Sequence, residues 1–437
     1  MKSIYDQLID WEKENTDFVL LEYDRNYTLG DILHEVNAMS KSLDYISESY
    51  IGIYLTSPID IIFLYLACIK NNKTPILFHE SWSETQVDHI INKYKITHII
   101  SQWSKRKIVN NKVVIDYLEE LANSSRGCGI STIPIESFHP EVVLFTSGST
   151  GCPKGVCLDL KNFYNSVTAW NSEINFVNSD VYTLCLPLSH ISGLSILYRA
   201  IYSKFSILIL DSYRDLDKYK ATLISLVPSV LNRIIDNKKY LKSLRLYRGI
   251  IIGGEAASID LLQKCLEMDL NIFVSYGMTE TCSGIAGYWI KDYPNELSSS
   301  GKPFSGVDFS IVNDHIQIKS KMNMRGYFME DDLSDSFITS DLGEIKDDFL
   351  YVKGRRDEIV TSGGEKINIS YVRDIILENV EIKSVVLTIL KDKRWGNVVH
   401  AEIASNTKSL SVQDVKQWCE SRMPNYCVPQ NIRIVTK

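Results

Sequence analysis

The feature that most constrains this chain is the loop at residues 145–156, which reads FTSGSTGCPKGV. The apolar run at residues 142–145 leads into it and predicts a buried strand. Seven of the ten residues after Phe145 are Gly, Ser or Thr. Glycines let a loop turn successive N–H groups toward one anion, hydroxyls add donors, and Lys154 adds positive charge. The loop predicts a phosphate site, with a solvated linker as the alternative. It departs from GxxxxGK[ST] because Gly155 follows Lys154.

Length and composition predict a soluble, cytoplasmic protein of two or more domains. The chain has 437 residues and a net charge of −7, so no basic surface indicates a nucleic-acid partner. The first residues lack the apolar region of a signal peptide, and the apolar run at residues 61–69 is too short to span a membrane. Nine cysteines contain no CxxC pair, and eight histidines show no HxxxH spacing. This pattern favours reduced thiols over disulfides or a zinc site.

Apolar runs and amphipathic helical stretches alternate through the first 140 residues, without internal repeats. This alternation predicts an α/β fold with a doubly wound, parallel sheet. The predicted strands are 51–55, 73–78 and 98–100, and the predicted helices begin near residue 28 or span 61–70 and 84–94.

Two later apolar runs each lead directly into a polar or glycine-containing motif. Three isoleucines at 250–252 precede Gly253, Gly254 and Glu255, and a run ending at Ser275 precedes Tyr276-Gly-Met-Thr-Glu280. Ligands collect at the carboxyl ends of strands in parallel sheets. Both motifs are therefore candidate ligand-binding loops, and we expect Glu280 to lie in an exposed loop.

The phosphate loop followed by YGMTE resembles the adenylate-forming superfamily, which contains acyl- and aryl-CoA ligases, peptide-synthetase adenylation domains and luciferases. The resemblance implies a large N-terminal lobe with doubly wound sheets, residues 1–352, that binds AMP. It also implies a small α+β C-terminal lobe, residues 353–437, with the active site in the cleft between the two lobes.

The resemblance assigns roles around ATP and Mg²⁺. Thr339-Ser340-Asp341 corresponds to the family's Thr-Gly-Asp, although taken alone it would be a surface turn. By resemblance Glu280 holds Mg²⁺, Thr279 contacts the α-phosphate, and Lys154, Thr279, Glu280 and His190 are the catalytic residues. The implied nucleotide-binding residues are Thr146, Ser147, Gly148, Ser149, Thr150, Gly151, Gly253, Gly254, Glu255, Tyr276, Asp341 and Arg355.

The acid pocket is implied by the segment LPLSHISGLSILYRAIY, which looks closest to o-succinylbenzoate–CoA ligases. The apolar residues from Leu184 predict a strand that ends in His190. By resemblance His190 and Gly277 line the acyl pocket, and Arg199 pairs with a second substrate carboxylate. The alternative for Arg199 is a surface side chain on a helix.

The C-terminal part carries the motifs of a rotating small domain. By resemblance Asp357 is the hinge, and Gly363 and Gly364 belong to the loop used in the thioester step; the alternative is an ordinary interdomain turn. The family's terminal Pro-Lys-Thr-x-Ser-Gly-Lys segment has no match before Lys437. Because its lysine bridges the substrate carboxylate and the α-phosphate, we expect the adenylation step to be impaired.

Three functions remain open at this point. The first is a ligase that activates a small carboxylic acid, aromatic or related, through an acyl-adenylate and transfers it to coenzyme A. The second transfers the acyl group to the phosphopantetheine of a carrier protein, or catalyses only the thioester half-reaction. The third is a non-catalytic nucleotide-binding partner protein. The sequence does not indicate the oligomeric state.

Overall fold

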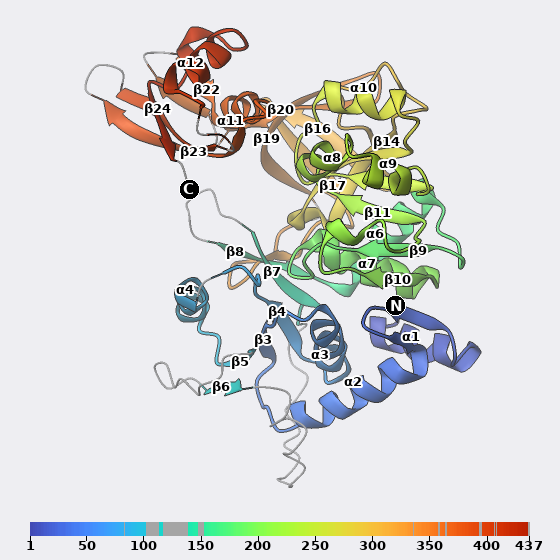
Figure 1. Ribbon diagram of the computed structural model, residues 1–437. Helices are drawn as coiled ribbons and strands as arrows, with labels where there is room; N and C mark the ends of the chain where they lie inside the picture. Colours follow the sequence, from blue (N-terminus) through green and yellow to red (C-terminus); the bar gives the residue numbers. More distant parts are fainter. Residues whose placement is uncertain are drawn as a thin grey trace. The chain divides into compact units, whose positions relative to one another are not determined.

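The computed structural model describes residues 1–82, 84–101, 113–116, 139–146, 153–334, 336–356, 359–362, 365–392, 396–405, 407 and 409–435 (Figure 1). The chain forms two compact units. The large unit contains Met1–Phe309, Ile318–Phe337 and Asp347–Leu350, and the small unit contains Ser310–Gln317, Ile338–Lys346 and Tyr351–Lys437. The predicted roles of Ser147, Gly148, Ser149, Thr150, Gly151, Asp357, Gly363 and Gly364 lie outside the described residues.

A seven-stranded sheet of the large unit carries the two ends of the predicted phosphate loop. Its order is β18-β8-β7-β4-β3-β5-β6, in which the pairs among β3 to β7 are parallel and β8 is antiparallel to both β7 and β18. The predicted strands are confirmed, and the loop joins an antiparallel pair. The bounds are β3 (Tyr50–Tyr54), β4 (Thr74–Leu77), β5 (His98–Ser101), β6 (Val113–Asp116), β7 (Val142–Thr146), β8 (Lys154–Leu158) and β18 (Gly326–Tyr327).

A nine-stranded sheet carries the other two candidate motifs. Its order is β15-β14-β13-β12-β11-β9-β10-β1-β2, parallel from β13 to β1 and antiparallel at both edges. The bounds are β1 (Val19–Glu22), β2 (Asn26–Thr28), β9 (Val181–Leu184), β10 (Ser206–Ile209), β11 (Leu223–Leu226), β12 (Gly249–Ile252), β13 (Ile272–Met278), β14 (Ser283–Trp289) and β15 (Lys302–Pro303).

Five helices of the large unit, α1, α2, α3, α9 and α10, begin at a capping side chain. Ser57 caps α3 and Pro58 occupies its first turn, where the missing N–H has no cost. Helices α6 and α7 pack against each other and against β14 (Figure 1). The bounds are α1 (Ile4–Glu14), α2 (Leu29–Leu43), α3 (Pro58–Lys70), α4 (Glu84–Tyr94), α6 (Leu160–Ile174), α7 (Ile191–Ser203), α8 (Pro228–Ile234), α9 (Lys238–Leu244) and α10 (Ile259–Glu267), with short 3₁₀ turns η1 (Tyr213–Asp215) and η2 (Thr279–Thr281).

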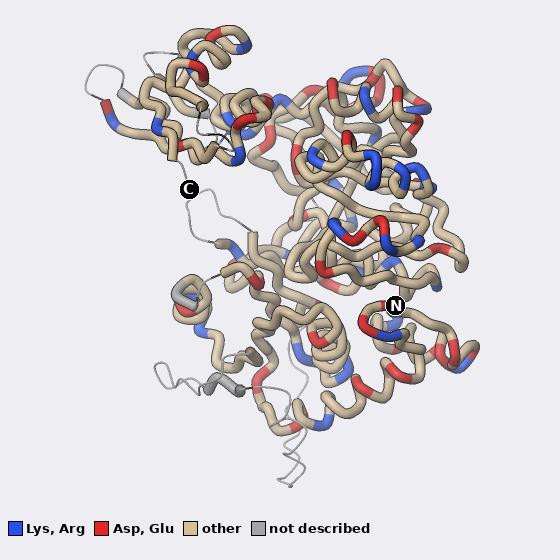
Figure 2. The backbone as a smooth tube through the Cα atoms, viewed as in Figure 1, with Lys and Arg blue, Asp and Glu red and all other residues tan. Residues whose placement is uncertain are grey.

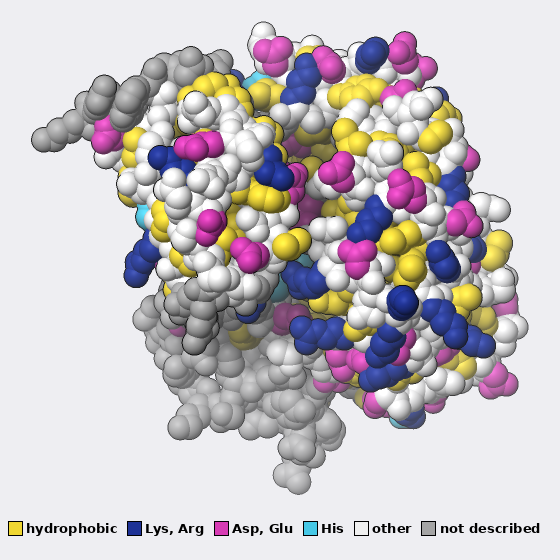
Figure 3. Space-filling view, turned by 45° about the horizontal axis from the view of Figure 1, so that its top comes forward, with side chains coloured by type: hydrophobic (Ala, Val, Ile, Leu, Met, Phe, Trp, Pro, Cys, Tyr) yellow, Lys and Arg dark blue, Asp and Glu magenta, His cyan; other side chains and the backbone are white. Residues whose placement is uncertain are grey.

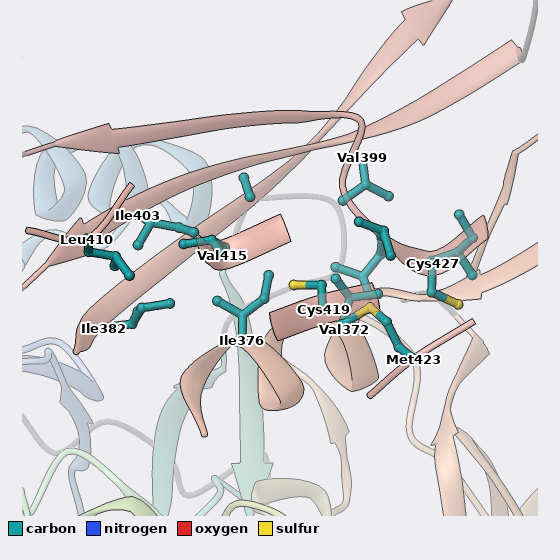
Figure 4. Packing of buried hydrophobic residues seen from close by; sticks show 14 residues of the cluster. Val372, Ile376, Ile382, Val399, Ile403, Leu410, Val415, Cys419, Met423 and Cys427 are labelled. Carbon is teal, nitrogen blue, oxygen red and sulfur yellow. The ribbon is translucent and has the colours of Figure 1, made fainter. Parts of the chain in front are cut away.

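The small unit has a hydrophobic core of its own, in which Val372 and Ile376 meet Val415, Cys419 and Ile403 (Figure 4). A four-stranded sheet, β16-β17-β19-β20, contributes residues to both units. The remaining bounds are β16 (Val307–Val312), β17 (His315–Ser320), β19 (Ser336–Lys346), β20 (Phe349–Arg355), β21 (Ile359–Ser362), β22 (Glu365–Asn368), α11 (Ile369–Leu377), β23 (Ile382–Asp392), β24 (Gly396–Ser405), α12 (Val412–Glu420), η4 (Asn425–Cys427) and β25 (Asn431–Val435).

Acidic and basic residues are interspersed along the chain (Figure 2), and side chains of both signs are present on the face shown in Figure 3. No helix within the described ranges is long and apolar enough to cross a membrane.

Each cysteine in the described part is a free thiol: Cys68, Cys157, Cys185, Cys265, Cys282, Cys419 and Cys427. The boundary predicted at residues 352/353 stays a prediction.

Candidate active site

The two ends of the predicted phosphate loop face each other across a hairpin. Thr146 at the end of β7 pairs with Lys154 at the start of β8. The Tyr94 hydroxyl on α4 donates to the carbonyl of Pro153 at 3.1 Å and accepts from the Gly155 N–H at 3.3 Å. The hairpin and α4 thus fix where the loop begins and ends.

The adjacent carboxyl ends of β12 and β13 bring the second and third motifs together. Ile252 pairs with Val274, so Gly253 and Tyr276 follow at the same edge. A Cβ on Gly253 would lie 2.8 Å from the Ser275 carbonyl oxygen, and Gly254 has φ +81°. Both positions therefore require glycine. The Glu255 carboxylate accepts a 3.2 Å hydrogen bond from a backbone N–H of α8, which places it beside these glycines.

The YGMTE motif is more ordered than we predicted. Strand β13 continues through Met278, and Thr279 and Glu280 lie in the 3₁₀ turn η2 with half-buried side chains. The expectation that Glu280 lies in an exposed loop is therefore wrong. The turn is closed by Thr281, whose hydroxyl accepts from the Met278 N–H at 3.0 Å and contacts the Ser283 carbonyl at 2.8 Å.

Lys154 and Glu280 both contact the side chain of Tyr327. The Tyr327 hydroxyl donates to Glu280 Oε1 at 3.2 Å, and the Lys154 ammonium lies 4.9 Å from the centre of the ring. Two charged residues that are far apart in the sequence thus meet on one aromatic side chain.

Arg199 lies inside the large unit and is not a surface arginine. The residue is 2% exposed, its guanidinium stacks 4.0 Å from the Trp170 ring, and one terminal nitrogen donates to the Ser283 hydroxyl at 2.9 Å. Its Nε has no hydrogen-bond partner, and no carboxylate pairs with it among the described residues. Burial lowers the pKa of this guanidinium, although an arginine stays charged in proteins. Among the described residues, this buried cation therefore has no counter-ion.

Gly277 belongs to the YGMTE motif and lies against the backbone of Ser283, the residue that accepts a hydrogen bond from Arg199. The register between β13 and β14 shifts between Tyr276 and Gly277, and a Cβ on Gly277 would lie 2.1 Å from the Ser283 carbonyl oxygen. Ser283 itself has φ +94°. The close approach therefore sets the position of the serine that holds Arg199.

His190 does not end a strand, because β9 ends at Leu184 and His190 is the residue before α7. The predicted strand end is therefore wrong by six residues. The His190 ring lies edge-to-face on His79, with 4.7 Å between ring centres. Burial of the ring lowers the pKa of His190, and the neighbouring His79 lowers it further. His190 is therefore biased toward the neutral imidazole.

Asp341 and Arg355 lie together in the small unit. Asp341 is buried within β19, and Arg355 Nη1 is 3.6 Å from Asp341 Oδ1. The Thr339 hydroxyl accepts from the Asp341 N–H at 3.1 Å and donates to the Ile316 carbonyl at 2.9 Å. This segment is part of a strand, so the surface-turn alternative is wrong.

Sequence reasoning assigned no role to Ser283, Trp170, His79 or Tyr327. Trp170 sits on an amphipathic helix, where a tryptophan is typical of a core position. Nothing in the sequence marks the positive φ of Ser283. The Gly-Tyr pair at Tyr327 was a usable signal.

The geometry can be compared with known proteins. A sequence profile described as "AMP-binding enzyme" matches residues 10–328. The chain belongs to the AMP-binding enzyme family. This membership confirms the predicted superfamily and α/β fold class, and together with the ligases it resembles it confirms the general reaction, that of an adenylate-forming acid–thiol ligase.

Two relatives of this AMP-binding enzyme are 2-succinylbenzoate–CoA ligases. That of Lactococcus lactis subsp. lactis is 29% identical over 423 residues, covering 93% of this chain and 91% of the relative. That of Bacillus velezensis is 32% identical over 314 residues, covering 66% of this chain and 63% of the relative.

Two solved structures show the same fold. The o-succinylbenzoate CoA synthetase of Bacillus subtilis with its acyl-adenylate intermediate OSB-AMP superposes with a TM-score of 0.84 at 24% identity, covering 98% of this chain and 94% of the other. The structure of the same enzyme in complex with ATP and magnesium ion also superposes with a TM-score of 0.84 at 24% identity. The match covers 98% of this chain and 95% of the other.

Proposed function

We propose that this AMP-binding enzyme is a 2-succinylbenzoate–CoA ligase, which uses ATP, Mg²⁺ and coenzyme A. The observation that carries the proposal is the buried Arg199 guanidinium with an unpaired Nε. A dry cation without a counter-ion is costly unless a ligand supplies the anion. An acid with a second carboxylate supplies it, and a planar guanidinium suits that group. The two relatives named for 2-succinylbenzoate support the same choice.

Attack of a carboxylate on the α-phosphate brings two anions together, so cations and N–H donors must offset their repulsion. Lys154 at the start of β8 supplies a cation, and Thr279 supplies a hydroxyl from η2, which contacts β8. We propose that Gly253, Gly254, Glu255 and Tyr276 border the adenine, and that His190 and Gly277 border the acyl group. Thr146 and the loop to Gly151 would hold the phosphates.

The described residues fit a magnesium ion held mainly by substrate oxygens. They contain no group of three or more His, Cys, Asp or Glu side chains that could form a complete metal site. Magnesium is usually bound by one or two carboxylates together with phosphates. Glu280 offers a half-buried carboxylate, which is hydrogen-bonded to Tyr327. When bound, the ion would neutralise phosphate charge; Glu280 would hold it in place.

The C-terminal residues carry further proposed roles. We propose that Asp341 accepts the ribose hydroxyls and that Arg355 contacts the same ribose. Asp357 would be the hinge between residues 1–352 and 353–437, with Gly363 and Gly364 in the loop used for thioester formation. Coenzyme A would be the acceptor, and a carrier-protein phosphopantetheine is the alternative.

Pyrophosphate release from Mg²⁺–ATP tests the proposal directly. The acids are 2-succinylbenzoate, the two analogues that each lack one of its carboxylates, benzoate and succinate, with and without coenzyme A. We expect release to be fastest with 2-succinylbenzoate, followed by formation of its CoA thioester. Faster turnover of a monocarboxylic acid would refute the substrate assignment.

The same assay separates the other hypotheses. If a thioester forms only with a phosphopantetheinylated carrier protein, the acceptor is that carrier protein and not coenzyme A. Thioester formation from chemically prepared acyl-adenylate, without pyrophosphate release from ATP, would limit the chain to the second half-reaction. ATP binding with neither reaction would refute the proposed activity and favour a nucleotide-binding partner protein.

A further inference from the structure

The two-residue strand β18 is tied to both catalytic segments of the large unit. It pairs with β8, where Tyr327 lies opposite Val156. The Met324 N–H donates to the Glu280 carbonyl at 2.7 Å, and the Phe328 N–H donates to the Gly155 carbonyl at 2.7 Å. Backbone hydrogen bonds therefore hold the segment around Tyr327 to the residue that follows Lys154 and to Glu280 itself.

The side chain of Tyr327 contacts two groups of opposite charge, the Glu280 carboxylate and the Lys154 ammonium. Its hydroxyl donates to Glu280 Oε1 at 3.2 Å, while the Lys154 ammonium lies 4.9 Å from its ring centre. Lys154 forms no ion pair with any described residue. A direct Lys–Glu ion pair would occupy both groups that phosphate and metal need. A cation–π contact between half-buried side chains is worth about 0.5–2 kcal/mol and yields to a phosphate.

We propose that Tyr327 is a positioning residue that fixes the Glu280 carboxylate for the metal and keeps the Lys154 ammonium available for phosphate. The hydroxyl occupies one carboxylate oxygen, so the carboxylate is oriented before the metal arrives. Such partners of metal-binding side chains commonly change metal affinity by about 10–100-fold when removed. The proposal rests on the proposed function, because it deepens the roles assigned there to Lys154 and Glu280.

Two substitutions separate the hydroxyl from the ring. Tyr327→Phe removes the donor to Glu280 and keeps the ring under Lys154, whereas Tyr327→Leu removes both contacts. The readouts are calorimetric binding of ATP over a range of Mg²⁺ concentrations, binding of ATP in the presence of a chelator, and the melting temperature. These measurements need no turnover.

We expect Tyr327→Phe to raise the Mg²⁺ concentration for half-maximal ATP binding by about tenfold, within the range for such partners. Its metal-free ATP binding should equal that of the wild type. Tyr327→Leu should show the same magnesium shift and should also weaken metal-free ATP binding, since the ammonium is no longer held. Wild-type magnesium dependence in Tyr327→Phe would overturn the proposal. The proposal would also be overturned if Tyr327→Phe had a lower melting temperature and bound ATP equally weakly at every Mg²⁺ concentration, because partial unfolding would then explain the loss.

Tyr293 offers a matched control in the same unit. Lys302 lies 4.7 Å from its ring centre, the ring packs on Tyr288 and Phe349, and the Tyr293 side chain is exposed. Tyr293→Phe and Tyr293→Leu should leave magnesium dependence unchanged; a shift equal to that of the Tyr327 variants would refute a specific role. ATP binding without acid-dependent turnover in the wild type would overturn the proposed function alone. Absence of any Mg²⁺–ATP binding would overturn both proposals.

Discussion

Replacing Arg199 with methionine should separate activity from stability. Arg199→Met removes the stack on Trp170 and the hydrogen bond to Ser283. A desolvated cation–π contact is worth about 2 kcal/mol, and a hydrogen bond from a charged group about 1.5–3 kcal/mol. Against this loss stands the desolvation penalty of a buried ion, which is several kcal/mol. The two effects nearly cancel, so we expect the melting temperature to change by only a few degrees.

Turnover of 2-succinylbenzoate should fall steeply in the same variant. Removing one partner of a buried ion pair leaves the other uncompensated and costs about 3–5 kcal/mol, or about 10²–10⁴-fold in kcat/KM. Arg199→Lys should recover only part of this loss, because an ammonium cannot make the two parallel hydrogen bonds of a guanidinium. The assay is pyrophosphate release, with melting temperatures measured on the same samples.

The monocarboxylic analogues identify the group that Arg199 recognises. The analogue that lacks the recognised carboxylate should be a poor substrate of the wild type, and Arg199→Met should use it as well as or better than the wild type does. Equal losses for the dicarboxylic acid and for both analogues would refute recognition of a second carboxylate. A melting temperature lowered by ten degrees or more would show that Arg199 is structural.

Three further changes test two other residues of the site and one buried carboxyl outside it. Gly277→Ala places a Cβ 2.1 Å from the Ser283 carbonyl, so it should displace Ser283 and weaken acid binding more than ATP binding, as measured by calorimetry. Asp341→Asn should weaken ATP binding by about 10–100-fold, since a hydrogen bond to a charged acceptor contributes about 1.5–3 kcal/mol; unchanged affinity would contradict its ribose role. Burial raises the pKa of Glu141 to about 7, so the folded state keeps a proton that the unfolded state releases above its usual pKa of about 4.3. Stability should therefore decline as pH rises between these values, by about 1.4 kcal/mol per pH unit, and Glu141→Gln should abolish that decline in melting-temperature profiles.

Strands and helices with strong periodicity were predictable from the sequence. The helix predicted at residues 84–94 is α4 (Glu84–Tyr94), and the strand predicted at 98–100 is β5 (His98–Ser101). Both succeed because turn residues bound a clear apolar pattern. The strand predicted to end in His190 fails because the apolar pattern continues from β9 into Leu186, Pro187 and Leu188, where a proline interrupts pairing.

The motifs located the candidate site, but the side chains that position it were not predictable. The role of Tyr327 depends on pairing between β18 and β8, whose residues are far apart in the chain. The partner of Arg199 depends on a left-handed backbone at Ser283, which no residue-type preference indicates for serine. Long-range register and local strain are properties of the folded chain, so they lie beyond pattern reasoning.

The β13–β14 irregularity gives a physical reason for joining nucleotide and acid recognition in one strand pair. Tyr276 and Gly277 are neighbours in sequence, yet one borders the proposed adenine site and the other contacts the backbone of Ser283. A non-glycine residue held at positive φ costs about 1–3 kcal/mol, which the surrounding structure must offset. The Thr281 hydroxyl donates to the Ser283 carbonyl at 2.8 Å and so helps to hold Ser283 in this conformation. Movement of the Tyr276 backbone on nucleotide binding would therefore reach Ser283, and through its hydroxyl the Arg199 guanidinium.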